Sequence, residues 1–467
     1  MLNKTIDKYK NEIIEQTQKL IQIPSTHKDS QNPYQPFGKE INNSLEYMLS
    51  LGNTLGFRTK NIDGYCGYIE FGKGSELIGI IGHLDVVPEG ENWTYPPFSG
   101  ELHNGNIYGR GAIDDKGPVI ASLYAMKAIM DTCKINKRIR LILGLNEERD
   151  WNCINYYKEH EEHPTISFSP DADFPCIYAE KGVLSSYLTM PYTPSNTDIK
   201  IVNIDCNNNP LNVVPKICSI HLKINTSNIL MCEFISVLKS IIDKYNFEID
   251  IYKINDEELK LTSHGVQAHA AHPDLGINAI SRLIVILNEL FINYNCSLEL
   301  LDFFNKYINT EFNGEKLGIN FEDESGKLTL NVGDFSLENN TLKIGMNLRI
   351  PVHTKLETIE AVFNKYISSY SPLKYSSHKY MAPLYIPKDN PLISILCRVY
   401  NEMTNQNLEP IAIGGATYAR AFPNCVSFGA NFPGNKDMCH QTDEFIPIDN
   451  LILSCKIYAK ALFELTN

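Results

Sequence analysis

The stretch that decides the fold is LIGIIGHLDVVPEG, which runs from Leu77 to Gly90. Its first part, LIGII, is a short apolar run with isoleucine at three of its five positions. Such a run is typical of a buried strand. It is followed by His83 and Asp85, two ionisable side chains that have to find a hydrogen-bond partner or a ligand when they are buried. We therefore expect a core strand whose carboxyl end carries functional groups.

Strand-like and helical runs alternate around this stretch, from about residue 65 to residue 182. The run GPVIASLYAMKAIMDT predicts a helix over residues 117–132, and RIRLILGL predicts a strand over residues 138–145. Strands that alternate with helices form βαβ units and a parallel sheet. The predicted fold class is therefore an α/β domain, with helices flanking a largely parallel sheet.

A second texture begins near residue 184. The runs SSYLTM, KICSIHLKIN and TLKIGMNLRI alternate like strands of an antiparallel sheet, and helical patterns lie near residues 231–245 and 277–292. Asn-rich turns separate the strands, and helical patterns return at residues 390–403 and 448–465. We predict one α/β domain of residues 1–183 and 384–467, interrupted by an inserted α+β domain of residues 184–383.

Composition excludes several classes of function. The net charge of −13 over 467 residues argues against a nucleic-acid-binding surface, which needs clustered positive charge. No apolar run reaches the roughly 18 residues of a membrane span, and the N-terminal segment has no signal-peptide core. The twelve cysteines are scattered without CxxC pairs, a pattern typical of reduced thiols in a cytoplasmic enzyme.

Polar side chains follow the strand-like runs of the α/β part, where the carboxyl ends of parallel strands form a crevice. Six of them are carboxylates, and two like charges about 4 Å apart cost about 4 kcal/mol at an effective dielectric constant of about 20. Bound cations would relieve this repulsion, and mixed histidine and carboxylate ligands suit zinc, manganese or cobalt. The sequence allows a two-metal site without requiring one. The residues concerned are His83, Asp85, Asp114, Asp115, Glu147, Glu148 and Asp171, together with His440 farther along the chain.

These residues lie in motifs that resemble those of a known family. In family order the motifs are GHLDVVP, YGRGAIDDKGP, the Glu-Glu pair, SPDADFP, NVVP, AHAAHPDLGINAI, GGATYARAF and HQTDE. The chain resembles the M20 family of metallopeptidases and, within it, the PepV-like bacterial dipeptidases. The resemblance covers nearly the whole chain. It implies a cytoplasmic, monomeric, metal-dependent dipeptidase that binds a small peptide substrate, with the inserted domain acting as a lid.

The resemblance also implies a role for each motif residue. Two divalent metal ions, zinc before manganese or cobalt, would be bound by His83 and Asp171 at one site and by Glu148 and His440 at the other, with Asp114 bridging them. Glu147 would be the general base that activates a metal-bridged water. Asp85 would accept the second ring N–H of His83, and His269 of the lid would stabilise the oxyanion. The substrate-binding residues would be Asn212, Arg349, Gly414, Gly415, Thr417 and Asp115.

Some alternatives stay open. The residues alone do not choose His269 over its neighbours His264 and His272, and Asp173 is close enough to Asp171 to be confused with it. The first rival function is an M20 amidohydrolase that removes an N-acyl group, such as a succinyl-diaminopimelate desuccinylase or an aminoacylase. In the family an aspartate at the Asp171 position goes with free-amino substrates, which favours dipeptides, β-Ala dipeptides among them. The second rival is an inactive metal- or peptide-binding protein, which would lack the base or a ligand.

Overall fold

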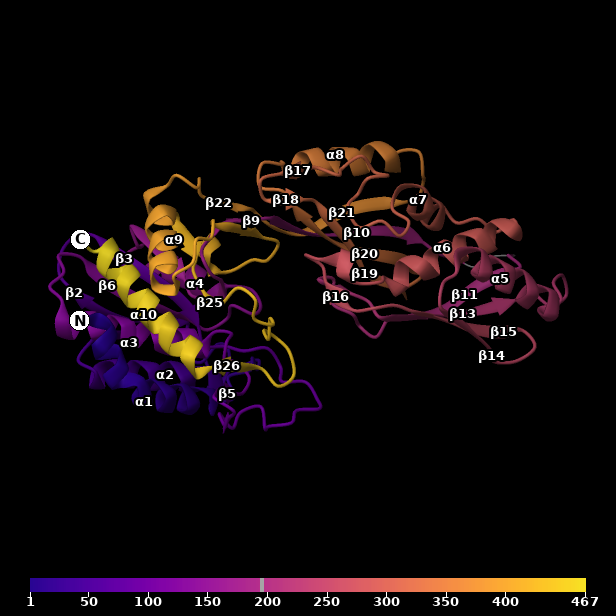
Figure 1. Cartoon of the computed structure of the whole chain (residues 1–467). Coiled ribbons are helices and arrows are strands. Elements are labelled where there is room, and N and C mark those ends of the chain that lie inside the picture. Colours follow the sequence, from indigo (N-terminus) through magenta and orange to yellow (C-terminus); the bar gives the residue numbers. More distant parts are fainter. Residues whose placement is uncertain (194–196) are drawn as a thin grey trace. The chain divides into compact units, whose positions relative to one another are not determined.

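The computed structural model describes residues 1–193 and 197–467. The chain forms two compact units, each with its own sheets and helices (Figure 1). Unit 1 comprises Met1–Ala179, Leu384–Ile411 and Ala416–Asn467, and unit 2 comprises Glu180–Pro383 and Ala412–Gly415. The short segment Ala412–Gly415, which the predicted domain bounds assign to the α/β domain, packs with unit 2.

The main sheet of unit 1 grows around the strand that opens the sequence argument. Its central strands β6, β3, β7 and β24 are neighbours and run parallel. The edge strands β1 and β2 pair antiparallel, as do β2 with β6 and β24 with β9. The strands of this sheet are β1 (Arg58–Ile62), β2 (Cys66–Gly72), β3 (Leu77–His83), β6 (Arg138–Gly144), β7 (Ile166–Ser169), β9 (Ile177–Glu180), β22 (Leu384–Tyr385), β23 (Ile411–Ile413) and β24 (Cys425–Ser427).

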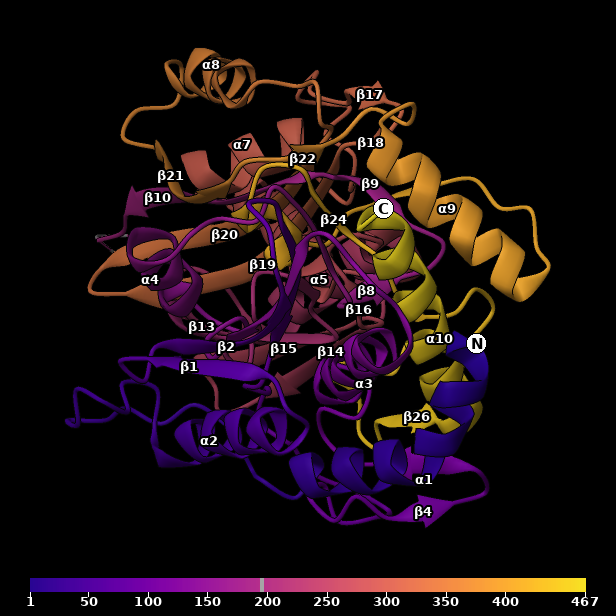
Figure 2. The same ribbon diagram turned by 90° about the vertical axis from the view of Figure 1, so that its left-hand side faces the viewer.

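Helices cover both faces of this sheet. Gly67 of β2 and Gly82 of β3 both pair with Leu143 of β6, so their α-hydrogens point to the same face. A Cβ atom would meet Leu45 of α2 at Gly67 and Val119 of α3 at Gly82, which places both helices on that face. Figure 2 shows β1 and β2 with α2 on one side of them and α4 on the other, so the second face is covered as well. The helices of unit 1 are α1 (Leu2–Ile21), α2 (Lys39–Thr54), α3 (Lys116–Thr132), α4 (Asn152–His160), α9 (Pro391–Thr404) and α10 (Ile448–Leu465).

Gly82 gives a direct test of this packing. A Cβ atom there would lie 2.5 Å from Val119 Cγ2 and 2.6 Å from Asp115 Oδ2. We expect Gly82→Ala to lower the free energy of unfolding by about 1–3 kcal/mol, as other overpacked cores do. Urea unfolding followed by circular dichroism measures this. Gly182→Ala is the matched control, because a Cβ atom there would make only ordinary contacts at 3.5 Å. An equal loss of unfolding free energy in both variants would contradict the close packing of α3 against Gly82.

Unit 2 contains antiparallel sheets with helices, as the alternating pattern of its sequence predicts. One sheet has the order β19-β20-β10-β21 and another the order β11-β13-β15-β14. The strands are β10 (Gly182–Pro191), β11 (Ile199–Asp205), β13 (Ile217–Ile224), β14 (Ile249–Lys253), β15 (Glu258–His264), β19 (Thr329–Glu338), β20 (Thr341–Ile350) and β21 (Lys374–Met381). The helices are α5 (Met231–Tyr245), α6 (Ala279–Asn293), α7 (Glu299–Tyr307) and α8 (Leu356–Ile367). The predicted fold class is confirmed by the two kinds of sheet.

Short elements complete both units. In unit 1 they are β4 (Leu102–His103), β5 (Asn106–Tyr108), β8 (Ala172–Asp173), β25 (Ala430–Asn431), β26 (Phe445–Pro447) and the 3-10 helix η2 (Tyr418–Ala421). In unit 2 they are β12 (Val213–Val214), β16 (Ala268–His269), β17 (Glu322–Asp323), β18 (Gly326–Lys327) and the 3-10 helix η1 (Pro273–Leu275). Within the described ranges, none of the helices combines the length and the apolar character that a membrane crossing needs.

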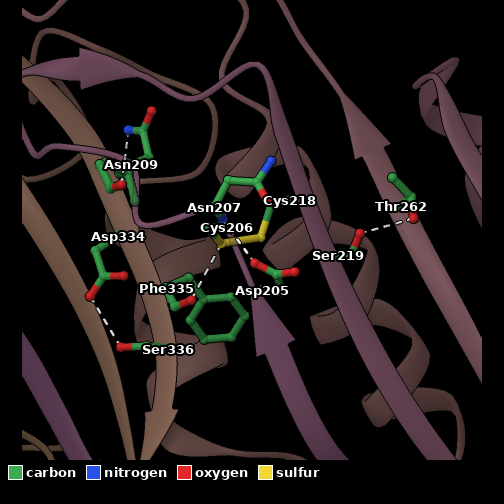
Figure 3. Close-up of a disulfide and its surroundings, with 12 residues drawn as sticks. Asp205, Cys206, Asn207, Asn209, Cys218, Ser219, Thr262, Asp334, Phe335 and Ser336 are labelled. Atoms are coloured by element: carbon green, nitrogen blue, oxygen red, sulfur yellow. Dashed lines mark hydrogen bonds between the residues drawn. A yellow bond between two sulfur atoms is a disulfide. The ribbon is translucent and has the colours of Figure 1, made fainter. Parts of the chain in front are cut away.

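A disulfide joins Cys206 and Cys218 in unit 2 (Figure 3). Asp205 of β11 pairs with Ser219 of β13, so the next residue along β11 comes to face Cys218. The expectation of reduced thiols is wrong for this pair, and the remaining cysteines are thiols. The error arises because spacing along the chain does not show which cysteines face each other across two strands. The disulfide closes the loop that carries Asn212 and β12.

Candidate metal centre and active site

The polar residues that follow the strands of unit 1 meet at one edge of the main sheet. His83 is the last residue of β3 and pairs with Gly144, the last residue of β6. Glu147 and Glu148 lie three and four residues after the end of β6, and Asp171 follows β7 by two residues. Because the three strands are parallel, their carboxyl ends lie side by side. The sheet therefore gathers the ligands that the motifs predict.

Two groups of potential metal ligands share one aspartate. The first group is His83, Asp114 and Asp171, and the second is Asp114, Glu148 and His440. His83 Nε2 lies 2.9 Å from Asp114 Oδ1 and 3.7 Å from Asp171 Oδ2. His440 Nε2 lies 3.0 Å from Asp114 Oδ2 and 3.1 Å from Glu148 Oε1. Each oxygen of Asp114 thus faces one histidine.

The spacing of these atoms fits divalent metal ions. Ligand atoms about 2.1 Å from a tetrahedral zinc ion lie about 3.4 Å from one another. The separations of 2.9–3.7 Å in the two groups are of this size. Imidazole and carboxylate donors also suit zinc, manganese and cobalt. The residues therefore have the donor chemistry and the spacing for two metal ions that share Asp114.

The ring of His83 is held in one tautomer. Its Nδ1 atom lies 2.9 Å from the backbone carbonyl oxygen of Asp85 and 3.6 Å from Asp85 Oδ1. A carbonyl oxygen only accepts, so Nδ1 carries the proton and Nε2 keeps its lone pair for a metal. The nearer acceptor for this N–H is the backbone carbonyl of Asp85, and the predicted acceptor, the carboxylate of the same residue, lies farther away.

The carboxylate of Asp85 instead binds the loop that carries the two glutamates. Its two oxygens accept the backbone N–H groups of Glu147 over 3.0 Å and Glu148 over 3.1 Å. Asp85 is buried, and through these two hydrogen bonds it orients the loop. The sequence predicted a supporting residue, but its partner could not be read from a local pattern, since the two contacts span more than 60 residues.

Asp115 is not placed to bind a substrate. It is completely buried, and its Oδ2 atom accepts the backbone N–H of His83 over 3.1 Å. The absence of a side chain at Gly82 leaves room for this carboxylate. The predicted substrate contact is therefore wrong in this structure. Asp115 is the N-cap residue of α3, where the chain turns inward.

Burial and mutual repulsion set the ionisation of the cluster. Burial raises the pKa of Glu147 and Asp171 well above the usual range of carboxyl groups, and neighbouring carboxylates add to the effect. Burial lowers the pKa of His440, but hydrogen bonds to Asp114 and Glu148 outweigh it and raise the pKa to about 12. Two imidazoles face a larger number of carboxylates here, so additional positive charge would stabilise the ionised cluster.

Asp171 and Asp173 take different places. Asp171 belongs to the first group, whereas Asp173 lies in β8 and accepts a hydrogen bond from Asn431 Nδ2 over 2.9 Å. Residues two apart point the same way only when both belong to one regular strand. Asp171 precedes β8, which begins at Ala172, so this rule does not apply to the two aspartates. The motif register, which favours Asp171, agrees with this placement.

Unit 2 brings several of the predicted substrate-binding residues together. Val213 of β12 pairs with His269 of β16, and Ala270 donates its N–H to the carbonyl of Asn212 over 2.9 Å. Asn212 and His269 are exposed. His264 lies in β15 and His272, which is also exposed, precedes η1, so of the three histidines His269 is the one in the β12–β16 pair beside Asn212.

Arg349 lies beside Gly414 in the same unit. It is buried, its Nη1 donates to the carbonyl of Gly414 over 2.6 Å, and its Nε donates to Asn347 Oδ1 over 2.9 Å. A Cβ atom at Gly414 would lie 2.7 Å from Ala271 Cβ, so the glycine allows the segment to approach the loop after His269. Arg349, Gly414 and the His269 loop are thereby neighbours.

Gly415 and Thr417 continue the same motif. Gly415 is the last residue of the segment that packs with unit 2, and Thr417 belongs to unit 1. The Thr417 hydroxyl lies 2.7 Å from Ser427 Oγ and accepts the N–H of Ala419 over 3.1 Å, so it caps η2. These contacts give Thr417 a structural task that the motif did not predict.

The comparisons with known proteins identify the family. The family model described as peptidase family M20/M25/M40 matches residues 79–464. The chain belongs to this family. A relative from Bacillus subtilis strain 168, named "Putative dipeptidase YtjP", is 38% identical over 461 residues, which cover 98% of this chain and 97% of the relative. The predicted family and the predicted class of enzyme, a peptidase, are confirmed.

Solved M20-type structures have the same fold. Human carnosine dipeptidase 1 matches with a TM-score of 0.61 at 15% identity, and the match covers 100% of this chain and 98% of that chain. The Bacillus subtilis YXEP protein, described as a dinuclear metal-binding peptidase of the M20 family, matches with a TM-score of 0.51 at 11% identity and covers 98% of this chain and 99% of that one. These likenesses support the fold class of the chain.

Two buried residues in the motifs that contain Asp114 and His440 were not singled out from the sequence. Arg110 and Glu444 form an ion pair with Nη1 2.7 Å from Oε2, and both are buried. Each lies inside a quoted motif, YGRGAIDDKGP or HQTDE. One motif contains a positively charged residue, Arg110, and the other a negatively charged one, Glu444. These opposite charges are the signal that could have suggested an ion pair. A third potential ligand group, Asp323, Glu324 and His353, lies in unit 2 and is largely exposed.

Proposed function

We propose that the protein is a metal-dependent dipeptidase that hydrolyses the peptide bond of dipeptides with a free N-terminus. The observation that carries the proposal is the pair of ligand groups that share Asp114 in a chain of the M20 family. Relatives that are named as dipeptidases and match over their full length support the substrate class. Unit 1 is the catalytic unit of this proposal, and unit 2 is its lid.

The chemistry follows from the residues of unit 1. Two divalent ions, zinc or alternatively manganese or cobalt, would be held by the two groups and would polarise the substrate carbonyl and acidify water. Glu147, next to the ligand Glu148, takes a proton from the attacking water and returns it to the leaving amine. Asp85 keeps Glu147 and Glu148 in place through their backbone N–H groups. His83 and Asp114 are buried, and burial strengthens their electrostatic interactions.

Residues of unit 2 complete the proposal for the substrate. His269, exposed at β16, donates to the oxyanion, and Asn212 beside it contacts the substrate. Arg349 has the planar fork that suits a carboxylate, and the backbone at Gly414 and Gly415 lies next to it. We place the enzyme in the cytoplasm as a monomer, as in PepV-like members with a large inserted domain.

Removal and return of metal test the proposal. Protein from which a chelator has removed the metal is expected to lose dipeptidase activity, and zinc, manganese or cobalt is expected to restore it. The reason is that the histidines and carboxylates of the two groups cannot themselves polarise the substrate carbonyl as a metal ion would. Hydrolysis of Ala-containing and β-Ala-containing dipeptides is compared with hydrolysis of N-succinyl and N-acetyl amino acids. Activity only on the N-acyl substrates would replace the dipeptidase by an amidohydrolase. A protein with two metals bound and no activity on either class would be a binding protein.

A further inference from the structure

One buried ion pair of unit 1 has no part in the chemistry above. Glu444 is 0% exposed and Arg110 is 2% exposed, and the two residues are 334 positions apart in the chain. Taking two charges out of water costs free energy that is recovered only with good geometry and additional hydrogen bonds. The other partners of Glu444 are therefore informative.

The Glu444 carboxylate binds one loop through its backbone. Oε2 accepts the N–H of Gly111 over 3.1 Å in addition to Arg110 Nη1 over 2.7 Å. Oε1 accepts the N–H groups of Ile113 over 3.0 Å and Asp114 over 3.2 Å. A carboxylate offers about four acceptor positions, so the acceptor capacity of Glu444 is spent on residues 110–114. The backbone carbonyl of Glu444 accepts the N–H of Gly109 over 2.9 Å and extends the same contact.

This loop ends on the aspartate that the two ligand groups share. Helix α3 begins only at Lys116, so Asp114 is not fixed by helical hydrogen bonds. Gly111 has a positive φ of 88°, a conformation that glycine adopts readily. The loop has two backbone hydrogen bonds of its own, from Ala112 to Gly109 and from Lys116 to Gly111, and neither of them involves the N–H of Asp114. The hydrogen bond to the Asp114 N–H fixes the backbone from which its side chain projects toward both histidines.

The same device recurs at two other ligand-bearing segments, those of His83 and Asp114. Asp85, two residues after His83, binds the N–H groups of Glu147 and Glu148. Asp115, next to Asp114, binds the N–H of His83. Glu444 lies four residues after His440 and binds the Asp114 loop. Each segment thus supplies a ligand and also a carboxylate that holds the backbone of another segment.

We propose that Glu444 is the positioning residue for Asp114. Its carboxylate, held by Arg110, fixes residues 110–114 so that both oxygens of Asp114 face the two histidines, and this sets the metal affinity of both groups. The inference rests on the proposed function only in taking the two groups as metal sites. The segment around HQTDE therefore contributes one ligand, His440, and positions a second, Asp114.

Glu444→Gln tests the inference with almost no change of volume. An amide has one oxygen, so its NH₂ group would face either Arg110 and Gly111 or Ile113 and Asp114, all of them donors. Metal-free protein is titrated with Zn²⁺ in competition with a chromophoric chelator. We expect both sites to bind about 10–100-fold more weakly, the size of effect that residues supporting metal ligands have in other proteins. Glu444→Asp, which keeps the charge on a shorter side chain, is expected to restore part of the affinity.

Glu70→Gln is the matched control. Glu70 is a 6% exposed glutamate in β2 whose Oε2 lies 2.6 Å from Arg140 Nη2, and it belongs to neither ligand group. The Glu70→Gln protein should have a lower thermal stability than the wild type, while its zinc affinity stays within about twofold of wild type. Wild-type affinity in a folded Glu444→Gln protein would overturn the inference. If Glu444→Gln does not fold, the zinc affinities of Glu444→Asp and Arg110→Lys are measured instead. Weaker binding supports the inference, and wild-type affinity in both folded variants overturns it.

The zinc titration also separates this inference from the proposed function. A wild-type protein that binds two zinc ions and hydrolyses no dipeptide would overturn the proposed function, and the affinity ratio between Glu444→Gln and wild type would still decide the role of Glu444. A wild-type protein that binds no zinc, manganese or cobalt would overturn both.

Discussion

Replacing Glu147 by alanine is expected to lower kcat for dipeptide hydrolysis by about 10²–10⁴-fold, the usual contribution of a general acid–base group. Glu147 lies three residues after the end of β6 and its backbone N–H is held by Asp85, so the backbone that carries its side chain is fixed beside the ligand Glu148. It belongs to neither group, and the variant should therefore bind two metal ions like the wild type. The measurements are steady-state kinetics and metal content on the same preparation.

Two comparisons make this prediction specific. Glu147→Gln keeps the size of the side chain but cannot accept a proton, and it should be as inactive as Glu147→Ala. Asp150→Ala removes an exposed carboxylate three residues farther along and should leave kcat within about twofold. A Glu147→Ala protein with two metals and wild-type kcat would transfer the role of base to another group. A parallel loss of metal would instead make Glu147 a ligand.

Local patterns were sufficient to predict the elements that carry the site. The apolar run from Leu77 becomes β3, the helix expected over residues 117–132 is α3 (Lys116–Thr132), and the helix expected over residues 448–465 is α10 (Ile448–Leu465). These segments are decided by the side chains within them, because period and length distinguish a buried strand from a helix. Their order in an alternating α/β pattern then indicates a parallel sheet, whose carboxyl edge is the expected place of ligands.

The partners of the buried carboxylates could not be predicted in this way. Asp85, Asp115 and Glu444 each bind backbone N–H groups of a segment at least 32 residues away. Residue type reveals that a buried carboxylate needs donors, but every backbone offers the same N–H group, so the sequence carries no mark of the chosen partner. The assignment of Ala412–Gly415 to unit 2 has the same origin, since it depends on contacts such as that of Gly414 with Arg349.

Replacing Asp114 by asparagine is expected to have the largest effect, because this residue belongs to both ligand groups. The asparagine has one oxygen in place of two, and its NH₂ group can neither bind a metal nor accept a hydrogen bond from a histidine. We expect the metal content to fall from two ions toward none and kcat/KM to fall by more than about 10³-fold, since the metals supply both the electrophile and the activated water. Metal analysis of dialysed protein and dipeptidase kinetics measure the two effects.

Three further variants, at Asp173 and at the two histidines, show whether Asp114 belongs to both ligand groups. Asp173→Asn changes a carboxylate that binds Asn431 and lies in neither group, so its metal content should remain at the wild-type value. His83→Ala and His440→Ala each remove a ligand from one group only. Each should therefore retain more metal than Asp114→Asn. If Asp114→Asn retained as much metal as either histidine variant, Asp114 would serve one group alone, and the other group would need a different carboxylate to complete its ligands.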